Sequence, residues 1–243
     1  MKLIAAQLAA HPGDIPRNLD KHRHAIEVAA GHGADCVFFP ELSLTGYEPH
    51  LAEQLAMLAS DQRLDVLQTL SDQHALVIGV GVPLVGDKGT EIGMVIFQPA
   101  QARSSYSKMH LHAHELPFFV PGKQQRVYQV KGQVLAPAIC FESLQPEHAQ
   151  QAAGLGAQVY VASVAKSAKG VLGAYAHYPQ IASELGMTVM MANCIGPADN
   201  FVGAGQSGVW NPKGERLCSA DADREVLLAY DLQTGIAALH KLA

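Results

Sequence analysis

Cysteine is scarce in this chain, and the four that are present, Cys36, Cys140, Cys194 and Cys218, lie far apart. They form no C-x-x-C pair, so the sequence offers neither a disulfide framework nor a zinc-ribbon pattern. Long hydrophobic runs are missing as well, because the longest one, residues 75–85, is broken by glycine and is too short to span a bilayer. We therefore expect a reduced, cytoplasmic, soluble protein with no membrane partner.

Charged residues are also few, at 16% of the 243 positions, and no run of like charge suggests a tail. The formal net charge is -5, which argues against a general phosphate-binding surface, so we expect no nucleic-acid partner. Hydrophobic residues make up 49% of the chain, enough for a sizeable buried core and too many for a disordered protein.

Short apolar segments alternate with segments of helical periodicity along the chain, a pattern typical of α/β proteins. We predict one α/β domain over residues 1–243, with both parallel strand–helix–strand units and hairpins. Strands are predicted at 2–8, 36–39, 75–83, 92–98, 104–110, 126–130, 133–140, 159–164, 188–194, 207–210 and 225–230. Helices are predicted at about 19–30, 51–74 and 146–155, with a fourth that ends near residue 186.

Three predicted strands end at a reactive side chain, namely Glu41, Lys108 and Cys140. Taken singly, a lone cysteine is more often a core residue, and a glutamate or lysine is more often solvated. Together they form a chemical set, since a nearby base and a cation favour the thiolate that attacks a carbonyl or nitrile carbon. An ammonium and a backbone N–H can then receive the negative charge that develops on the substrate.

The segments that carry these residues resemble signature segments of a known family. FPELSLTGY (39–47), YSKMHL (106–111) and PAICFES (137–143) occur in the order found in the nitrilase (carbon–nitrogen hydrolase) superfamily. The resemblance continues through ELPFFVPG (115–122) and FVGAGQSGVWNPKGE (201–215), so it spans nearly the whole chain. It implies an α/β fold of four layers, an α-β-β-α sandwich, and a thiol-dependent hydrolase of non-peptide carbon–nitrogen bonds.

The resemblance also implies a role for each residue of the set. Glu41 would be the general base, Lys108 the stabiliser of the oxyanion, and Cys140 the nucleophile. Glu115 matches the family's second glutamate, which positions the lysine and the substrate, and the backbone N–H of Phe141 would be the other oxyanion donor. No cofactor is implied, and the family assembles through helices, so we expect a homodimer or a higher homo-oligomer.

The match departs from the family pattern after the nucleophile. Many family amidases have aspartate two residues after the cysteine and arginine four residues after it, where this chain has Glu142 and Leu144. Phe141 occupies the position of the tryptophan that commonly follows the nucleophile in nitrilases. We therefore expect a small linear amide rather than a nitrile as the substrate. We also expect Glu142, Asn193 and residues 163–178 to border the pocket, with Lys166 or Lys169 facing any anionic group of the substrate.

A different interpretation uses the alternating histidines His110, His112 and His114. Three histidines on one face of a strand could converge on a metal ion, with a carboxylate from elsewhere, and support a metal-dependent hydrolase. In the resembling family this segment is a loop, so strict alternation on one face is not expected. We favour the thiol chemistry, with no resident metal, and expect His110 to pack near the pocket. A nitrile hydrolase, an acyltransferase of the same family and a catalytically silent protein remain alternatives.

Overall fold

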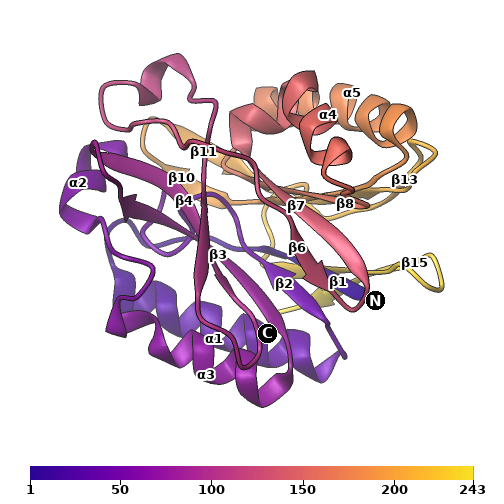
Figure 1. Cartoon of the computed structure of the whole chain (residues 1–243), viewed down its shortest axis with the longest axis horizontal. Coiled ribbons are helices and arrows are strands. Elements are labelled where there is room, and N and C mark those ends of the chain that lie inside the picture. Colours follow the sequence, from indigo (N-terminus) through magenta and orange to yellow (C-terminus); the bar gives the residue numbers. More distant parts are fainter. Residues whose placement is uncertain (243) are drawn as a thin grey trace.

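Two β-sheets stacked face to face form the centre of the computed structural model, which describes residues 1–242 (Figure 1). The first sheet has the strand order β15-β14-β1-β2-β3-β4-β5, the second has the order β13-β12-β9-β8-β7-β6, and β10 pairs with β11. The strands are β1 (Lys2–Gln7), β2 (Cys36–Phe38), β3 (Val77–Val85), β4 (Thr90–Phe97), β5 (Ser104–Ser107), β6 (Tyr128–Val130), β7 (Gln133–Ile139), β8 (Val159–Val164), β9 (Thr188–Asn193), β10 (Ile195–Ala198), β11 (Phe201–Ala204), β12 (Gly208–Trp210), β13 (Arg216–Ser219), β14 (Val226–Asp231) and β15 (Ile236–Lys241).

Helices cover the two outer faces, with α1 and α3 on the first sheet and α4 and α5 on the second (Figure 1). The α-helices are α1 (Ile15–Gly31), α2 (Ala52–Leu55), α3 (Asp65–His74), α4 (Pro146–Gly154) and α5 (Ala168–Leu185). Short 3₁₀ helices are η1 (Pro49–Leu51), η2 (Gln62–Leu64), η3 (Ala113–Glu115) and η4 (Cys140–Leu144). The predicted four-layer α-β-β-α sandwich is therefore confirmed.

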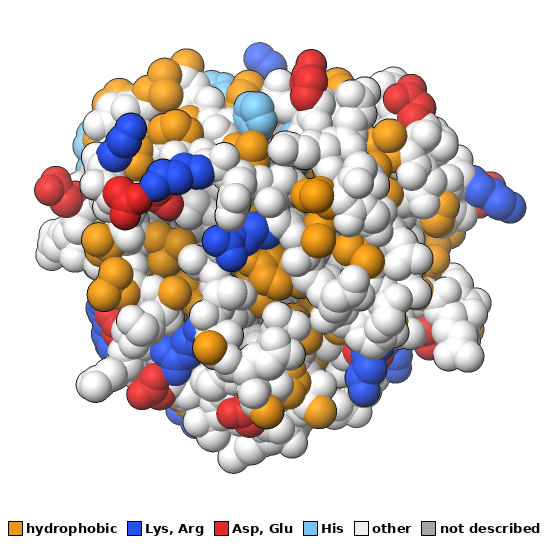
Figure 2. All heavy atoms as spheres, viewed as in Figure 1, with side chains coloured by type: hydrophobic (Ala, Val, Ile, Leu, Met, Phe, Trp, Pro, Cys, Tyr) orange, Lys and Arg blue, Asp and Glu red, His pale blue; other side chains and the backbone are white. Residues whose placement is uncertain are grey.

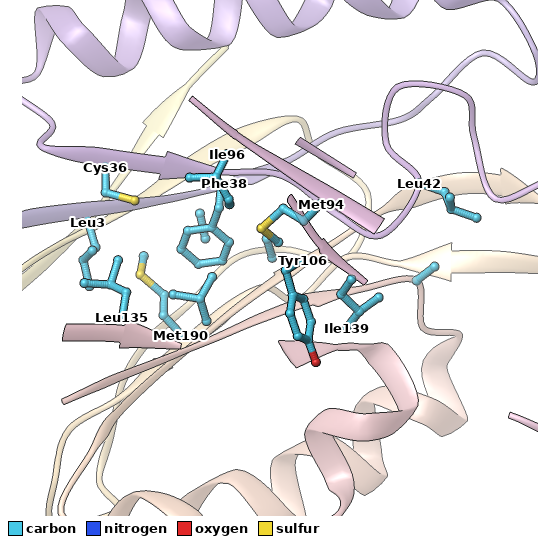
Figure 3. Close-up of a cluster of buried hydrophobic side chains, with 14 of the residues drawn as sticks. Leu3, Cys36, Phe38, Leu42, Met94, Ile96, Tyr106, Leu135, Ile139 and Met190 are labelled. Carbon is cyan, nitrogen blue, oxygen red and sulfur yellow. The ribbon is translucent and has the colours of Figure 1, made fainter. Parts of the chain in front are cut away.

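Three apolar cores separate these layers. Because side chains alternate along a strand, Leu3 and Ala5 of β1 enter the core between the sheets, while Ile4 and Ala6 enter the core under α1 and α3. Figure 3 shows the core between the sheets, where side chains such as Phe38 and Met190 come from opposite sheets. Central strands are buried on both faces, and this burial explains why they appear in the sequence as continuous apolar runs.

Parallel and antiparallel pairs are mixed in both sheets, as predicted. The pairs β1–β2, β2–β3, β7–β8 and β8–β9 are parallel, and the remaining neighbours are antiparallel. The predicted hairpin around Lys131 and Gly132 joins β6 to β7, and both of its turn residues have positive φ, of 49° and 79°. This is the backbone that a two-residue hairpin turn with the right-handed twist of a sheet requires.

The prediction of one helix over residues 51–74 is wrong in its middle. Helix α2 ends at Leu55 and α3 begins only at Asp65. Between them the Met57 N–H donates to the carbonyl of Pro83, and the Met57 carbonyl accepts from Val85 N–H, both on β3. This pairing with a sheet outweighs the helical pattern of the sequence, because it satisfies the backbone of the segment while it buries the Met57 side chain.

On the face shown in Figure 2, basic and acidic side chains are interspersed rather than gathered by sign. None of the helices in residues 1–242 combines the length and the apolar character that crossing a membrane would require.

Candidate active site

Cys140 lies at a sharp turn where β7 ends and η4 begins. Its φ is 51°, a left-handed value that is uncommon outside glycine. The thiol Sγ lies 3.7 Å from the carbonyl oxygen of Ala165, to which it donates, and 3.9 Å from the Nζ of Lys166. The backbone thus presents Cys140 toward the segment that follows β8.

Glu41 follows β2, and a glycine on the neighbouring strand sets its position. A Cβ atom on Gly81 of β3 would lie 2.4 Å from the carbonyl oxygen of Pro40 and 2.5 Å from the nitrogen of Leu42. Only glycine therefore allows the chain on either side of Glu41 to lie so close to β3. The carboxylate itself is buried, and its Oε1 accepts a hydrogen bond of 2.7 Å from the Nζ of Lys108.

Lys108 follows β5 and is fully buried between two carboxylates. Its Nζ donates to Glu41 Oε1 and to Glu115 Oε1, each at 2.7 Å. Glu115 is held in turn by the hydroxyl of Tyr47, at 2.9 Å, and by the backbone N–H of His112, at 2.7 Å. An ammonium held in this way has little freedom to turn, so its charge stays beside Glu41 and Glu115.

Burial governs the protonation states of the site. Burial and the nearby Glu41 carboxylate raise the pKa of the Cys140 thiol to about 11, although Lys166 and Lys108 act in the opposite direction. Burial also raises the pKa of Glu41, against the effect of the Lys108 ammonium. For Lys108, burial alone would lower the pKa, but Glu41, Cys140 and Glu115 together raise it. At neutral pH the thiol is therefore protonated at rest, and its reaction requires a base.

Glu41 has a free oxygen for that purpose. Its Oε2 is buried and takes no hydrogen bond of normal length, while the Cys140 thiol is close enough to lower the pKa of Glu41 as a weak donor. A buried carboxylate oxygen without a partner costs free energy, so such an atom in a folded protein calls for a functional explanation. The arrangement can accept a proton from Cys140 on one oxygen while the other stays on Lys108.

A cavity of about 470 Å³ opens in front of Cys140. Glu41 and Lys108 lie behind its wall, whereas Cys140 and Glu115 are part of it. The remaining lining residues are Tyr47, His112, His114, Phe141, Leu144, Ala165, Lys166, Ser167, Gly170, Asn200 and Phe201. The size suits a small molecule, and the wall combines apolar side chains such as Phe141 and Leu144 with polar ones such as Glu115, Lys166 and Asn200.

Two of the four residues expected to bind the substrate or its oxyanion, Phe141 and Lys166, line this cavity, as does part of the expected segment 163–178. Lys169 is exposed on α5 and is not among the lining residues. Asn193 is fully buried behind the wall, where its side chain accepts from the Lys166 N–H and donates to the carbonyls of Lys166 and Gly205. The expectation that Asn193 borders the pocket is therefore corrected, because its side-chain amide is taken up by the backbone of Lys166 and Gly205.

Glu142 is also turned away from the cavity, and this placement corrects the expectation of substrate contact. Its Oε1 accepts from Ile139 N–H and from the Tyr106 hydroxyl, each at 2.7 Å. Its Oε2 accepts from the N–H groups of Met109, at 2.6 Å, and His110, at 3.3 Å. Glu142 thus joins the turn that holds Cys140 to the segment that follows Lys108.

The position of Glu142 leads to a prediction for pH-dependent stability. Burial raises the pKa of Glu142 from 4.5 to about 7, so the folded protein binds this proton more tightly than the unfolded chain does. The stabilisation by that proton is complete below pH 4.5 and is lost as the pH rises through about 7. We expect Glu142→Gln, which cannot titrate, to lose less stability over this range than the parent protein.

Urea unfolding of the two proteins at several pH values measures this difference. Buried His148 titrates in the opposite sense, because burial and His110 lower its pKa to about 4. Its Nε2 lies 3.7 Å from Glu142 Oε1, so the two proteins are compared only at about pH 5 and above, where His148 is neutral in both folded proteins. The substitution is also expected to lower stability throughout by roughly 1–3 kcal/mol, since an amide cannot accept on both sides. Parallel curves of unfolding free energy against pH for the two proteins would contradict the raised pKa of Glu142.

The three alternating histidines do not converge on one point. The rings of His112 and His114 lie 4.4 Å apart at the cavity, and their Nδ1 atoms share a hydrogen bond of 2.5 Å. His110 is exposed and packs edge-on against His148, with ring centroids 5.9 Å apart, so the expectation that it packs near the pocket is wrong. Within residues 1–242, no three His, Cys, Asp or Glu side chains are placed to hold a metal ion.

Sequence reasoning missed Tyr47, Asn200 and Phe201 as cavity residues. Tyr47 is the last residue of the segment 39–47, Asn200 precedes β11, and Phe201 begins it. The rings of Tyr47 and Phe201 pack together, with their centroids 5.6 Å apart. Tyr47 and Phe201 both belong to segments that carry family motifs, but nothing in either segment indicates that the two meet across the cavity.

Comparison with known proteins assigns the chain to a family. Residues 3–241 match the carbon-nitrogen hydrolase family, and the chain belongs to it. It is 30% identical over 232 residues to an (R)-stereoselective amidase of a Pseudomonas species, covering 92% of this chain and 82% of the amidase. It is also 25% identical over 248 residues to a glutamine-dependent NAD(+) synthetase of Rhodobacter capsulatus, but it covers only 44% of that protein's length.

Among solved structures, the NitN amidase of Nesterenkonia sp. AN1 superposes with a TM-score of 0.86 at 29% identity, covering 96% of this chain and 92% of that one. Variants of that amidase carry acrylamide added to the active-site cysteine or bind butyramide. These comparisons confirm three predictions from the sequence: the fold, the family, and the class of enzyme, which is a carbon–nitrogen hydrolase. The prediction of a single domain over residues 1–243 stays a prediction.

Proposed function

We propose that this chain hydrolyses a small linear amide through a thioacyl intermediate on Cys140. The observation that carries the proposal is the buried set of Glu41, Lys108 and Glu115 behind a thiol that faces a cavity. Proteins similar to this chain include two amidases of nearly full coverage, and one of them has a structure with a reagent on its active-site cysteine. Both likenesses support an amide substrate.

In the proposed reaction Glu41 Oε2 takes the thiol proton as Sγ attacks the amide carbon. The oxyanion that forms is stabilised by the Lys108 ammonium and by the backbone N–H of Phe141, and losing one such donor costs about 3 kcal/mol in other hydrolases. Glu41 then returns the proton to the leaving nitrogen, and ammonia departs. A water molecule, activated by the same carboxylate, cleaves the thioester and restores the thiol.

Glu115 has a positioning role in this scheme. Its carboxylate fixes Lys108 through a bond of 2.7 Å and is itself part of the cavity wall. Glu142 and Asn193 position the turn of Cys140 and the segment of Lys166 respectively, and neither contacts the substrate. No cofactor takes part, and the His112–His114 pair has no step assigned to it.

Trapping the intermediate tests the proposal directly. Intact-protein mass spectra, recorded after rapid acid quench across a panel of amides that includes glutamine, should show the protein plus one acyl group, located by digestion on Cys140. Glutamine belongs in the panel because of the glutamine-dependent relatives. Turnover that a chelator abolishes and iodoacetamide does not affect would support the metal-dependent alternative and contradict the thiol mechanism.

The cavity leads to a prediction about substrate choice. Leu144 is an apolar part of the wall at the position of the family arginine, and Phe141 replaces the tryptophan of nitrilases. We expect measurable hydrolysis of small linear amides and little of the matched nitriles, compared as kcat/KM on pairs such as butyramide and butyronitrile. A larger kcat/KM for the nitrile would show that this chain is a nitrilase, and rapid transfer to added hydroxylamine would favour acyl transfer.

We also propose that the chain forms at least a homodimer through α4 and α5. Both helices follow the nucleophile, and exposed leucines lie on α5 and directly after α4, with Leu172 71% and Leu155 48% exposed. Sedimentation velocity at micromolar concentration should give a dimer or a larger species. Leu172→Glu should shift the distribution toward monomer, whereas the same change at Leu58, which is exposed on the other side of the fold, should not.

A further inference from the structure

Lys166 differs from Lys108, the other cation of the site, because no carboxylate accompanies it. Its side chain lies on the cavity wall and is buried, with only 5% of the residue exposed. Within residues 1–242 no Asp or Glu oxygen lies within ion-pair distance of its Nζ, whose one hydrogen-bond contact is the Sγ of Cys140 at 3.9 Å. Burying an ammonium is costly unless a counter-charge arises near it.

The surrounding chain is built to hold Lys166 in this place. Asn193 accepts the Lys166 N–H at 2.8 Å and donates to its carbonyl at 3.1 Å, and Ala204 N–H donates to the same carbonyl at 2.9 Å. A Cβ atom on Gly170, in the first turn of α5, would lie 3.1 Å from the Lys166 Cβ. The glycine therefore leaves room for the lysine stem to lie along the helix.

The charges of the site balance both before and after the thiol loses its proton. With both glutamates ionised and the thiol protonated, two carboxylates face two ammoniums, Lys108 and Lys166. Lys108 is already shared by Glu41 and Glu115. When the thiol proton moves to Glu41, one negative charge disappears beside Lys108 and another forms on Sγ, beside Lys166. The site then stays neutral, and each anion has a cation next to it.

We infer that Lys166 is a second catalytic cation, whose ammonium stabilises the Cys140 thiolate as it forms and again as it leaves the acyl group. The inference rests on the proposed role of Cys140 as nucleophile. In the first step the S–H bond breaks and its proton passes to Glu41, and in deacylation the C–S bond breaks and its electron pair returns to sulfur. Lys166 transfers no proton in either step.

The alkylation rate of Cys140 tests this inference without any amide turnover. Iodoacetamide forms an S–C bond with the thiolate and releases iodide, so its rate against pH reports how readily the thiol ionises. The titratable groups around Cys140 in the structure are Glu41, Glu115, Lys108, Lys166, Tyr47, Tyr178 and Cys194, with His112 and His114 on the same cavity wall. The measurement uses a Cys218→Ser background, because Cys218 is also partly accessible, and mass spectra identify the alkylated residue.

Lys166→Met keeps the aliphatic stem and removes the charge. We expect its pH–rate profile to move to higher pH by at least one unit, so that alkylation below the transition slows about tenfold or more. Lys166→Arg keeps the charge and should stay near the parent profile, and Lys169→Met, on the exposed face of α5, should match it. Gly170→Ala, whose methyl group pushes against the Lys166 stem, should also move the pH–rate profile to higher pH, by less than Lys166→Met does. This variant provides the test if Lys166→Met does not fold.

Superposable profiles for the parent protein, Lys166→Met and Gly170→Ala would overturn the inference. It would also be overturned if Lys166→Met slowed anionic iodoacetate but left the iodoacetamide profile in place, because Lys166 would then bind anions rather than stabilise the thiolate. If iodoacetamide does not alkylate Cys140 in the parent protein, the proposed function itself fails. The two failures are thus distinguishable.

Discussion

Replacing Cys140 with alanine is expected to reduce amide hydrolysis on the order of 10⁴- to 10⁶-fold, the range found when a hydrolase loses its nucleophile. The loss follows because Glu41 and Lys108 then have no thiol to activate and no thioester can form. Folding should survive, since the thiol makes only weak contacts, with Ala165 at 3.7 Å, with Lys166 at 3.9 Å and with Glu41, and alanine tolerates the left-handed backbone no worse than cysteine does.

Initial rates on the preferred amide, with circular dichroism and thermal unfolding as folding checks, provide the measurement. Cys218→Ala is the matched control, because this thiol lies on β13 outside the cavity, and it should keep the parent rate. Iodoacetamide should inactivate the parent and the control alike. Full activity in the Cys140 variant would contradict the assignment of Cys140 as the nucleophile.

The second large effect separates the two glutamates. Glu41→Gln keeps the size of the side chain but removes its basicity, so acylation should slow by at least ~100-fold, the usual contribution of a placed base. Glu115→Gln should also reduce amide turnover, because the bond that fixes Lys108 and the hydrogen bonds from Tyr47 and His112 are disturbed. Its thiol, however, should still react with iodoacetamide at a near-normal rate, since Glu41 remains.

Alkylation rate against pH, measured on both variants beside the amide kinetics, decides between these roles. The structure sharpens the expectation, because the free oxygen near Cys140 belongs to Glu41, whereas Glu115 is engaged by three donors. Equal suppression of alkylation in the two variants would mean that Glu115 shares the proton transfer. In that case the division of roles is wrong.

Motifs in the sequence were sufficient for the residues at the centre of the site. Glu41, Lys108 and Cys140 each follow a strand, and their segments occur in the order of the family, so the sequence alone predicts that they converge. The fold brings Lys108 within 2.7 Å of Glu41, 67 positions away in the chain. The apolar runs of the central strands predicted the α/β class, because burial on both faces leaves a strong pattern, whereas the resemblance to the family predicted the sandwich.

Residues that act through the shape of the backbone were harder to predict. Glu142 stands where many family amidases have aspartate, and this position led us to expect that it borders the pocket. Its two oxygens are instead taken by Ile139, Tyr106, Met109 and His110. A carboxylate in a motif looks the same in sequence whether it faces a cavity or satisfies backbone N–H groups. Only the surrounding donors decide which role it has.

By itself the sequence determined the α/β class and the order of the reactive segments, because these depend on local pattern, and it gave the layers of the fold through the resemblance to the family. The tertiary structure decided the rest. It separated His110 from His112 and His114, placed Asn193 behind the cavity, and set Lys166 beside Cys140 without a carboxylate. Such outcomes depend on contacts between strands and loops distant in the chain, where burial and hydrogen bonding outweigh any preference of a single segment.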